Sequence, residues 1–522
     1  MSGMRRRSWV LLTGSAVVLT VTLAPYLVAW QAQPFGYVFS GFLVNPIDGF
    51  SYLAKMRQGT AGSWLFHLPY AAEAGAGALL FTYYLLLGHV VRIVGASSLT
   101  VYHLARLIGT AAMLGAASFF FRTTLTESRA RTWAMALTLF GSGLGWIGVG
   151  VGRLPIDLWV PEAIPLFSAY ANAHFPLAAA GMLTAMTVLS APDLRRGLRW
   201  GGAGLAGLVL ALVQPFAVLP VVAVGIVWAA WTRMRPAADS PAKDVPRQQL
   251  VAALVFMAAS LPWLVYDVWV TTVQPALAVW SAQNLTPTPP PLDVLLGYGV
   301  VLGLAIASLF VVRPQTSSGG RLLVAWLLLG LILVFVPFGL QRRMLLGIFF
   351  PMAALAGLVF SRLALGGRGR RWLAYLLFVL CLPSNLVILA ATLGGALAQE
   401  PELVMGSAER AAYAWIADEI PAGSLILAGE VTGNRLPAYA DVGVRYGHPF
   451  ETPHAAGELA WVQSIYRSAD STGHVLAEMR RRGVEYVYVG PRERTMGALA
   501  WLAALDPVYQ DEAVAIYGLP AP

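Results

Sequence analysis

The residue best suited to chemistry is an aspartate early in the chain. Asp48 lies in the run 45–49, Asn-Pro-Ile-Asp-Gly, just before a short predicted helix. A carboxylate held there could act as a general base toward an incoming hydroxyl, or hold a divalent ion against a phosphate. Aspartate is also a preferred helix N-cap, which stabilises a helix by about 1 kcal/mol. The residues alone leave catalysis and capping equally open.

The helix that follows Asp48 is amphipathic. Phe50, Leu53 and Ala54 share one face. Lys55 and Arg57 lie away from that face. The pattern therefore predicts a helix with one apolar face and two cations pointing elsewhere.

Two further candidates follow in the same loop. The run 64–73 holds three aromatic side chains together with His67 and Glu73. Both could join Asp48 in one pocket, where the aromatic rings could stack on a ligand. A belt of interfacial aromatic residues with a solvated glutamate would look the same. For His67 alone the aromatic belt is the preferred interpretation.

Acidic residues recur in a second loop. Asp157 and Glu162 follow Arg153, and His174 comes shortly afterwards. Side chains from the two loops could converge on one ligand, although a solvated loop would have the same composition. We therefore keep Asp157, Glu162 and His174 as candidate substrate-binding residues.

Three arginines are candidates for anion binding. Arg342 and Arg343 form a basic turn between two apolar runs, and Arg106 lies within an apolar run. Arginine makes paired, charge-assisted hydrogen bonds to phosphate, and a charge inside an apolar segment is a functional candidate. The alternative for all three is that the side chain reaches ordinary lipid headgroups.

The elements that must position these residues are apolar helices. Of 522 residues, 57% are hydrophobic and 12% are charged, whereas soluble domains carry roughly a quarter charged residues. Runs near the ~20 residues that a bilayer requires predict about eleven membrane spans. They lie near 8–30, 101–121, 133–152, 174–191, 201–214, 217–232, 250–267, 293–312, 322–338, 344–361 and 372–393. We expect a tight hairpin at Pro215, between the fifth and sixth runs.

The net charge of +9 comes from arginines in alternate loops. This is the positive-inside pattern, and it requires no nucleic-acid partner. It holds if the run 78–95 is an interfacial helix that does not span. The N-terminus is then cytoplasmic, and the loops 31–100, 153–173 and 268–292 and the turn 339–343 lie outside. The cytoplasmic segments hold Arg5, Arg6, Arg7, Arg122, Arg129, Arg131, Arg195, Arg196, Arg199, Arg233, Arg235, Lys243, Arg247, Arg313, Arg321, Arg362, Arg368, Arg370 and Arg371.

The composition changes near the C-terminus. Short β-rich runs at 424–428, 485–489 and 513–517 alternate with helical stretches at 407–419 and 474–482. This predicts two domains, a membrane domain over 1–394 and an extracytoplasmic α/β domain over 399–522. The fold class is thus mostly α, a polytopic helix bundle with a soluble α/β domain. The segments 433–437 and 446–452 suggest no known activity.

Several chemistries lack support in the sequence. There is no P-loop, no G-x-G-x-x-G, no H-E-x-x-H and no G-x-S-x-G. Cys381 is the only cysteine, so neither an intrachain disulfide nor a cysteine metal site can form. The loops contain no D-x-D or E-x-D pair, and participation of a divalent metal ion is left open.

The layout resembles the GT-C superfamily of membrane glycosyltransferases, which includes protein O-mannosyltransferases, the aminoarabinose transferase of lipid A and oligosaccharyltransferase catalytic subunits. The resemblance covers residues 1–394 and rests on Asp48 in a long first outer loop and on Arg106 near the start of the second span. A second acidic loop, matched by Asp157 or Glu162, and the basic turn Arg342-Arg343 complete it.

The resemblance implies inverting transfer of a sugar from a polyprenyl-phosphate carrier at the outer face of the membrane. Asp48 would be the base, Glu73 and an acid of the second loop would assist, and Arg342 and Arg343 would hold the donor phosphate. The partners would be the lipid-linked sugar and membrane lipids.

Two other classes of function remain. A lipid-linked glycan flippase or other transporter would place polar residues at mid-membrane between repeated halves, whereas here they concentrate in the outer loops. A non-catalytic scaffold with a partner-binding soluble domain would retain the same layout. The sequence does not determine the sugar, the acceptor or the oligomeric state.

Overall fold

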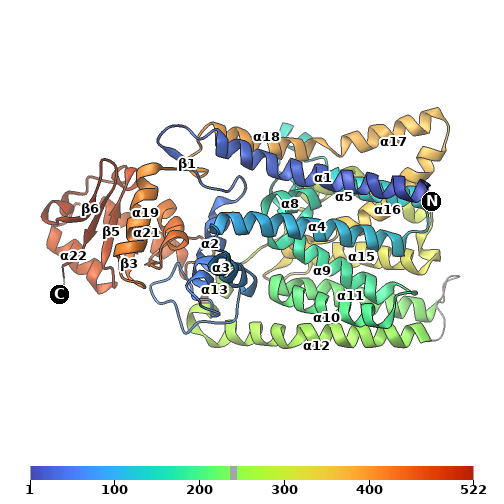
Figure 1. Ribbon diagram of the computed structural model, residues 1–522, viewed down its shortest axis with the longest axis horizontal. Helices are drawn as coiled ribbons and strands as arrows, with labels where there is room; N and C mark the ends of the chain where they lie inside the picture. The colour runs from blue at the N-terminus through green and yellow to red at the C-terminus, as the bar shows by residue number, and fades with distance from the viewer. Residues whose placement is uncertain (1, 236–243, 521–522) are drawn as a thin grey trace. The chain divides into compact units, whose positions relative to one another are not determined.

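The computed structural model describes residues 2–235 and 244–520, which form two compact units (Figure 1). The helical unit comprises Met1–Pro25, His103–Val265 and Thr286–Thr392. The mixed unit comprises Tyr26–Tyr102, Tyr266–Leu285 and Leu393–Pro522. Four long helices, α1, α4, α12 and α18, contain residues of both units.

The helical unit and the helices shared with it contain the following elements. They are α1 (Ser2–Gln31), α4 (Ser98–Thr124), α5 (Ser128–Phe140), α6 (Gly145–Gly150), α7 (Ile156–Trp159), η1 (Pro161–Ala163), α8 (Pro165–Ala171), α9 (His174–Ser190), α10 (Arg196–Val213), η2 (Pro215–Ala217), α11 (Val218–Met234), α12 (Asp244–Val273), α14 (Pro291–Val311), η3 (Pro314–Thr316), α15 (Ser318–Phe335), η4 (Gln341–Leu345), α16 (Phe349–Leu365), α17 (Arg368–Leu380) and α18 (Pro383–Leu397).

Among the described residues, eight helical segments are long and apolar enough to cross a membrane. Each coincides with one of the eleven predicted runs. They are Thr13–Gln31, Ser98–Thr124, Pro215–Met234, Val245–Val273, Pro291–Val311, Ser318–Phe335, Gln341–Leu365 and Arg368–Leu397.

The other three predicted runs form helices that fall short of these criteria. The run 133–152 is divided between α5 and the six-residue α6, and α9 has 17 residues. The 18-residue α10 carries Arg196 and Arg199, which lower its hydropathy. The predicted break at Pro215 is confirmed, because η2 separates α10 from α11.

Several helices of this unit pack against α16 (Figure 1). Its apolar span is 94% buried, and it contacts α5, α14 and α17. A Cβ at Gly357 would lie 2.6 Å from the carbonyl oxygen of Ala130 on α5. Only glycine therefore permits this close approach of the two helices.

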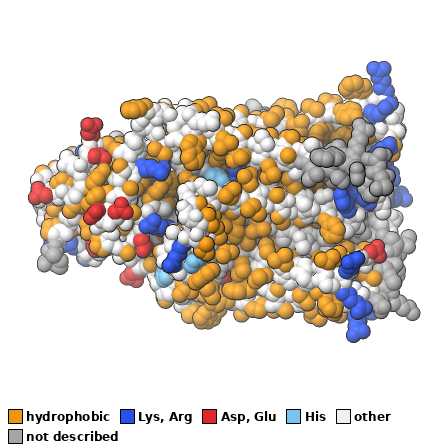
Figure 2. All heavy atoms as spheres, viewed as in Figure 1, with side chains coloured by type: hydrophobic (Ala, Val, Ile, Leu, Met, Phe, Trp, Pro, Cys, Tyr) orange, Lys and Arg blue, Asp and Glu red, His pale blue; other side chains and the backbone are white. Residues whose placement is uncertain are grey.

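The outer surfaces of the helices are apolar. Figure 2 shows hydrophobic side chains along the helices, with Lys and Arg side chains gathered at one end of them. Exposed examples include Leu205, Ile226, Leu254 and Phe310. A soluble protein rarely exposes so many large apolar side chains together, and lipid is the solvent that suits them. The protein is therefore a multi-pass membrane protein.

One of the basic residues predicted to be cytoplasmic, Lys243, lies outside the described residues.

The mixed unit contains strands as well as helices. Its elements are β1 (Tyr37–Phe39), α2 (Pro46–Thr60), α3 (Thr82–Val94), α13 (Pro275–Gln283), β2 (Val404–Gly406), α19 (Ser407–Glu419), β3 (Leu425–Leu427), α20 (Glu430–Tyr439), β4 (Gly443–Val444), α21 (Ala455–Arg467), α22 (Thr472–Arg481), β5 (Tyr486–Val489), α23 (Pro491–Arg494), η5 (Ala500–Ala504), β6 (Pro507–Gln510) and β7 (Ala515–Gly518).

The five-stranded sheet has the order β4-β3-β5-β7-β6 (Figure 1). β3 is parallel to β4 and β5, whereas β7 is antiparallel to β5 and β6. The three predicted β-rich runs form β3, β5 and β7, and α19 has the bounds predicted for the helix at 407–419. The α/β character of the C-terminal part is thus confirmed. Its core includes Leu427, Val462, Met479, Val487 and Trp501.

Distant segments join to form the mixed unit. β1 pairs antiparallel with β2, Val38 opposite Met405, and α2 packs against both α3 and α20. The sequence predicted a domain boundary between residues 394 and 399. Grouped by contacts between residues, the first outer loop, 31–100, belongs to the same unit as the C-terminal sheet. α3 has 13 residues, fewer than a span requires, and its interfacial placement stays a prediction.

Candidate functional site

Asp48 lies in the first turn of α2 and does not cap it. The cap position is Asn45, whose φ of 46° is left-handed, and Pro46 opens the helix. The capping interpretation of Asp48 was therefore wrong. Its carboxylate is nonetheless well placed, because the N-terminus of a helix stabilises negative charge.

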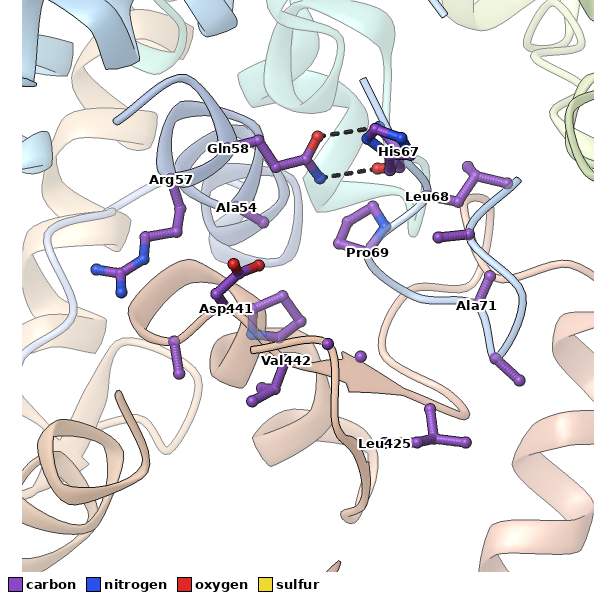
Figure 3. A pocket seen from close by; sticks show the side chains of 16 residues that line it. Ala54, Arg57, Gln58, His67, Leu68, Pro69, Ala71, Leu425, Asp441 and Val442 are labelled. Atoms are coloured by element: carbon purple, nitrogen blue, oxygen red, sulfur yellow. Dashed lines mark hydrogen bonds between the residues drawn. The ribbon is translucent and has the colours of Figure 1, made fainter. Parts of the chain in front are cut away.

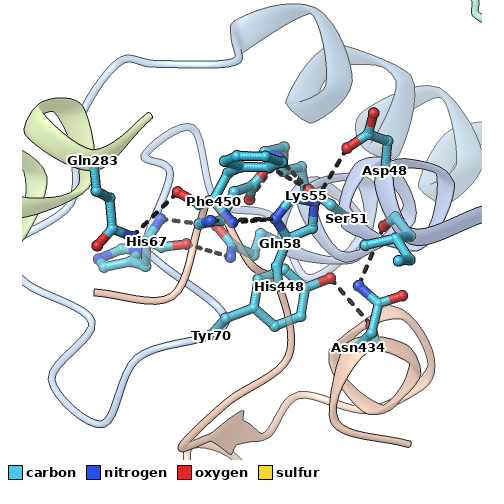
Figure 4. A network of polar contacts seen from close by, with 12 residues as sticks. Asp48, Ser51, Lys55, Gln58, His67, Tyr70, Gln283, Asn434, His448 and Phe450 are labelled. Carbon is cyan, nitrogen blue, oxygen red and sulfur yellow. Dashed lines mark hydrogen bonds and ion pairs between the residues drawn. The ribbon is translucent and has the colours of Figure 1, made fainter. Parts of the chain in front are cut away.

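The carboxylate of Asp48 meets a histidine 400 positions away (Figure 4). Asp48 Oδ1 lies 3.1 Å from His448 Nε2. The side chain of His448 is 3% exposed, and that of Asp48 is 41% exposed. One partner is thus held within the protein while the other is accessible to a ligand.

Lys55 lies two turns further along α2 and is completely buried. Its Nζ lies 2.8 and 3.0 Å from the two carboxylate oxygens of Glu451, and Ser51 Oγ donates to the same carboxylate at 2.7 Å. The ammonium is also 4.3 Å from the centroid of the Phe81 ring. The sequence predicted that Lys55 lies away from the apolar face of its helix. On that side the segment that contains Glu451 packs over Lys55 and buries it.

Two pKa shifts follow from this burial. Burial is the largest single influence on Glu451 and raises its pKa, but the electrostatic effects of Lys55 and His448 and the hydrogen bonds from Lys55 and Ser51 together hold the pKa below its ordinary 4.5. Burial also raises the pKa of the Tyr70 phenol well above 10, and the charges of Glu451 and Asp48 add to this. The buried pair is therefore ionised at neutral pH, and Tyr70 is not.

The turn that carries His448 and Glu451 is internally braced. Thr452 Oγ1 accepts hydrogen bonds from the backbone N–H groups of Gly447, at 3.2 Å, and His448, at 3.1 Å. Gln283 of α13 donates to the carbonyl oxygens of Phe450 and Thr452. The segment 446–452, which suggested no activity in the sequence, thus supplies two of the residues around Asp48.

Glu73 takes no part in this group, whereas His67 lies beside it and is joined to Gln58 (Figure 4). In the part of the chain that the structure describes, the Glu73 carboxylate is exposed and makes no hydrogen bond or ion pair. His67 is tied through its backbone to the Gln58 side chain, at 2.8 and 2.9 Å. It lines a cavity of about 140 Å³ with Arg57, Gln58 and Asp441 (Figure 3), and Asp48 is not part of that lining.

The basic turn in the helical unit has an acidic partner. Glu162 Oε1 lies 3.6 Å from Arg342 Nε and 3.3 Å from Arg343 Nη1, and its side chain is 2% exposed. Trp159 and Phe175 place rings 5.1 and 5.9 Å from the two guanidinium groups. One carboxylate thus lies within ion-pair distance of two guanidinium groups, both of which are partly exposed.

The remaining candidates are occupied in other ways. Asp157 is buried and accepts hydrogen bonds from Gly143 N at 3.1 Å and Gly145 N at 3.0 Å, while burial raises its pKa to about 6. Arg106 Nη1 donates to the carbonyl oxygens of Thr22, Ala169 and Tyr170 at 2.8–3.2 Å. These contacts favour structural roles for both residues.

His174 lies beside a ring that contacts one of the two arginines. It begins α9, is 7% exposed, and its ring centroid lies 4.1 Å from that of Phe175, the ring beside Arg343. Asp48 belongs to the mixed unit and Arg343 to the helical unit. Their predicted convergence on one ligand stays a prediction.

Among the described residues, no three His, Cys, Asp or Glu side chains gather as a structural zinc site requires. A hydrated divalent ion needs only one or two carboxylates, and its participation stays a prediction.

No protein-family model and no curated protein matches the sequence. In structure, the chain is similar to ArnT from Cupriavidus metallidurans bound to undecaprenyl phosphate, with a TM-score of 0.55, 13% identity and 98% of each chain covered. It is equally similar to apo ArnT, at 0.55 and 12%, covering 99% of this chain and 100% of that one. It is also similar to the Archaeoglobus fulgidus oligosaccharyltransferase tethered with an acceptor peptide, at 0.50 and 12%, covering 97% and 74%. The chain therefore has the fold of the GT-C superfamily of membrane glycosyltransferases, which the layout of its loops had implied.

Proposed function

We propose that this protein is an inverting glycosyltransferase that uses a polyprenyl-phosphate sugar as its donor. The observation that carries the proposal is the accessible carboxylate of Asp48, held by a buried side chain, in a chain with the GT-C fold. The similarity to ArnT bound to undecaprenyl phosphate supports the choice of donor.

The chemistry is a single displacement at the anomeric carbon. The acceptor hydroxyl oxygen forms a bond to that carbon while Asp48 takes the hydroxyl proton. The bond from the carbon to the phosphate oxygen breaks on the opposite side, and the polyprenyl phosphate leaves with the electron pair. Arg342 and Arg343 stabilise the negative charge that develops on the phosphate. Their partial exposure suits them to this role.

The reaction is tested with undecaprenyl phosphate carrying radiolabelled hexoses or pentoses, with the purified protein in liposomes and an envelope extract as the acceptor source. We expect protein-dependent release of undecaprenyl phosphate with at least one donor. A transporter would instead move the intact donor across the bilayer, and a scaffold would do neither. Absence of release throughout the series contradicts the proposal.

Binding of the donor phosphate should depend on Arg343. A hydrogen bond to a charged group contributes about 1.5–3 kcal/mol, so Arg343→Gln should weaken binding of undecaprenyl phosphate about ten- to a hundredfold. Arg368→Gln, at the exposed start of α17, is the matched control and should bind as wild type. Fluorescence titration in nanodiscs measures both. Equal affinity of the two variants would remove Arg343 from the site.

We further propose that the N-terminus is cytoplasmic and that the sheet of the mixed unit lies outside the membrane. Cysteines introduced at Thr316 and Ser471 test this, because both positions are exposed and the native Cys381 is buried. Thr316 is a better position than the adjacent Ser317, because a cysteine at 317 would remove the hydroxyl that caps α15. In intact cells, an impermeant maleimide should label the cysteine at 471 and spare the one at 316. The reverse pattern contradicts the orientation.

A further inference from the structure

We propose that His448 is the positioning residue for Asp48, held as a neutral imidazole whose only ring proton is on Nε2. This inference rests on the proposed role of Asp48 as base. In this arrangement the imidazole orients the carboxylate without neutralising it.

The position of the ring proton follows from the backbone around His448. Its Nδ1 accepts hydrogen bonds from the N–H groups of Phe450, at 3.1 Å, and Glu451, at 3.2 Å. A ring nitrogen that accepts a hydrogen bond carries no proton, so the proton of the neutral ring is on Nε2. That nitrogen faces Asp48 Oδ1 at 3.1 Å. If Nδ1 were protonated, its N–H would face the backbone N–H groups of Phe450 and Glu451, and both hydrogen bonds would be lost.

The ring cannot easily turn away from Asp48. It is nearly buried and stacks on Tyr70, with centroids 5.9 Å apart and an angle of 25° between the planes. The Tyr70 hydroxyl donates to the carbonyl oxygen of Asn434 at 3.1 Å, which fixes the stacking partner. The brace supplied by Thr452 fixes the backbone of the turn. The donor therefore has one direction in which to point, as Figure 4 shows.

A neutral donor suits a carboxylate that is to act as a base, because it makes a weaker hydrogen bond than a charged donor and stabilises the carboxylate less. The same turn carries Glu451, which engages Lys55 with both carboxylate oxygens. The turn 446–452 thus supplies both the group that orients Asp48 and the counter-ion of the buried Lys55.

Two substitutions distinguish the effect of the hydrogen-bond donor of His448 from the effect of its ring. His448→Leu removes the donor, whereas His448→Gln can place an amide N–H near the position of Nε2. In the undecaprenyl phosphate release assay, His448→Leu should lower kcat about ten- to a hundredfold, the loss expected for one hydrogen bond to a charged group. We expect KM for the donor lipid to be unchanged and His448→Gln to restore most of kcat. A merely structural histidine would not be replaced selectively by glutamine.

The tautomer is measured independently of activity. In the full-length protein with ¹⁵N-labelled histidine, the signals missing from His448→Gln belong to His448. We expect one protonated and one unprotonated ring nitrogen, with the unprotonated one assigned to Nδ1. A protonated Nδ1 or a cationic ring would overturn the proposal whatever the kinetic constants of the two variants.

The proposed function can fail separately. Full activity of Asp48→Asn would remove the base and with it the proposed reaction. Loss of activity in Asp48→Asn with wild-type kcat in His448→Leu would overturn only the positioning role.

Discussion

Replacing Asp48 with asparagine lowers the rate of sugar transfer by at least about 100-fold, the low end of the roughly 10²–10⁴ expected for a general base. The amide keeps the size of the carboxylate, and its oxygen can still accept the hydrogen bond from His448 Nε2. It cannot take a proton from the acceptor. The loss should therefore appear in kcat, with KM for the donor lipid little changed.

Two control variants sharpen this measurement. Asp418→Asn removes an exposed carboxylate from the end of α19 and should leave the rate as in wild type. Glu73→Gln tests the helper carboxylate that the sequence predicted. Because that side chain is exposed and makes no contact with the group around Asp48 in the described residues, we expect a small effect. A wild-type rate for Asp48→Asn, with the melting temperature unchanged, would show that another group takes the proton.

Breaking the buried pair of Lys55 and Glu451 costs the mixed unit about 3–5 kcal/mol of its free energy of unfolding, as for other buried pairs that lose one partner. Glu451→Gln leaves the ammonium of Lys55, which is fully buried, without its counter-charge. The cooperative thermal transition of the purified protein, followed by limited proteolysis of the mixed unit, measures the loss.

The double variant Lys55→Met, Glu451→Leu is the matched comparison. It removes both charges together, so it should be more stable than either single variant, since apolar replacements of buried pairs are often neutral. Arg481→Met breaks an exposed pair with Glu478 and should cost about 1 kcal/mol or less. Equal losses in the single and double variants would contradict the importance of the uncompensated charge.

The same pair predicts the direction of the pH dependence. The folded pKa of Glu451 lies below its ordinary value of 4.5. Its contribution to stability is therefore fully present above pH 4.5 and is lost as the pH falls toward the folded pKa. Acid unfolding of the double variant should lack this component.

The sequence by itself determined the features that depend on local pattern. Apolar runs of sufficient length predicted eight helices that the structure confirms as long and apolar enough to span, and alternating β-rich runs predicted β3, β5 and β7. The basic turn of Arg342 and Arg343 stood out because it lies between two apolar runs. Asp48 stood out because its residue type and its place before a helix are both visible in the chain.

Only the tertiary structure decided what surrounds these residues. His448 and Glu451 lie about 400 positions from their partners on α2, and no periodicity relates segments so far apart. The amphipathic pattern placed Lys55 off the apolar face of its helix, yet the turn 446–452 buries it. Glu451 of that turn supplies the counter-charge that offsets the cost of burying the ammonium. Glu162, rather than Asp157, meets the arginines because backbone N–H groups of the 143–145 segment already hold Asp157. Burial and long-range pairing set the charge and proton of each group here, and both arise only when distant parts of the chain pack together.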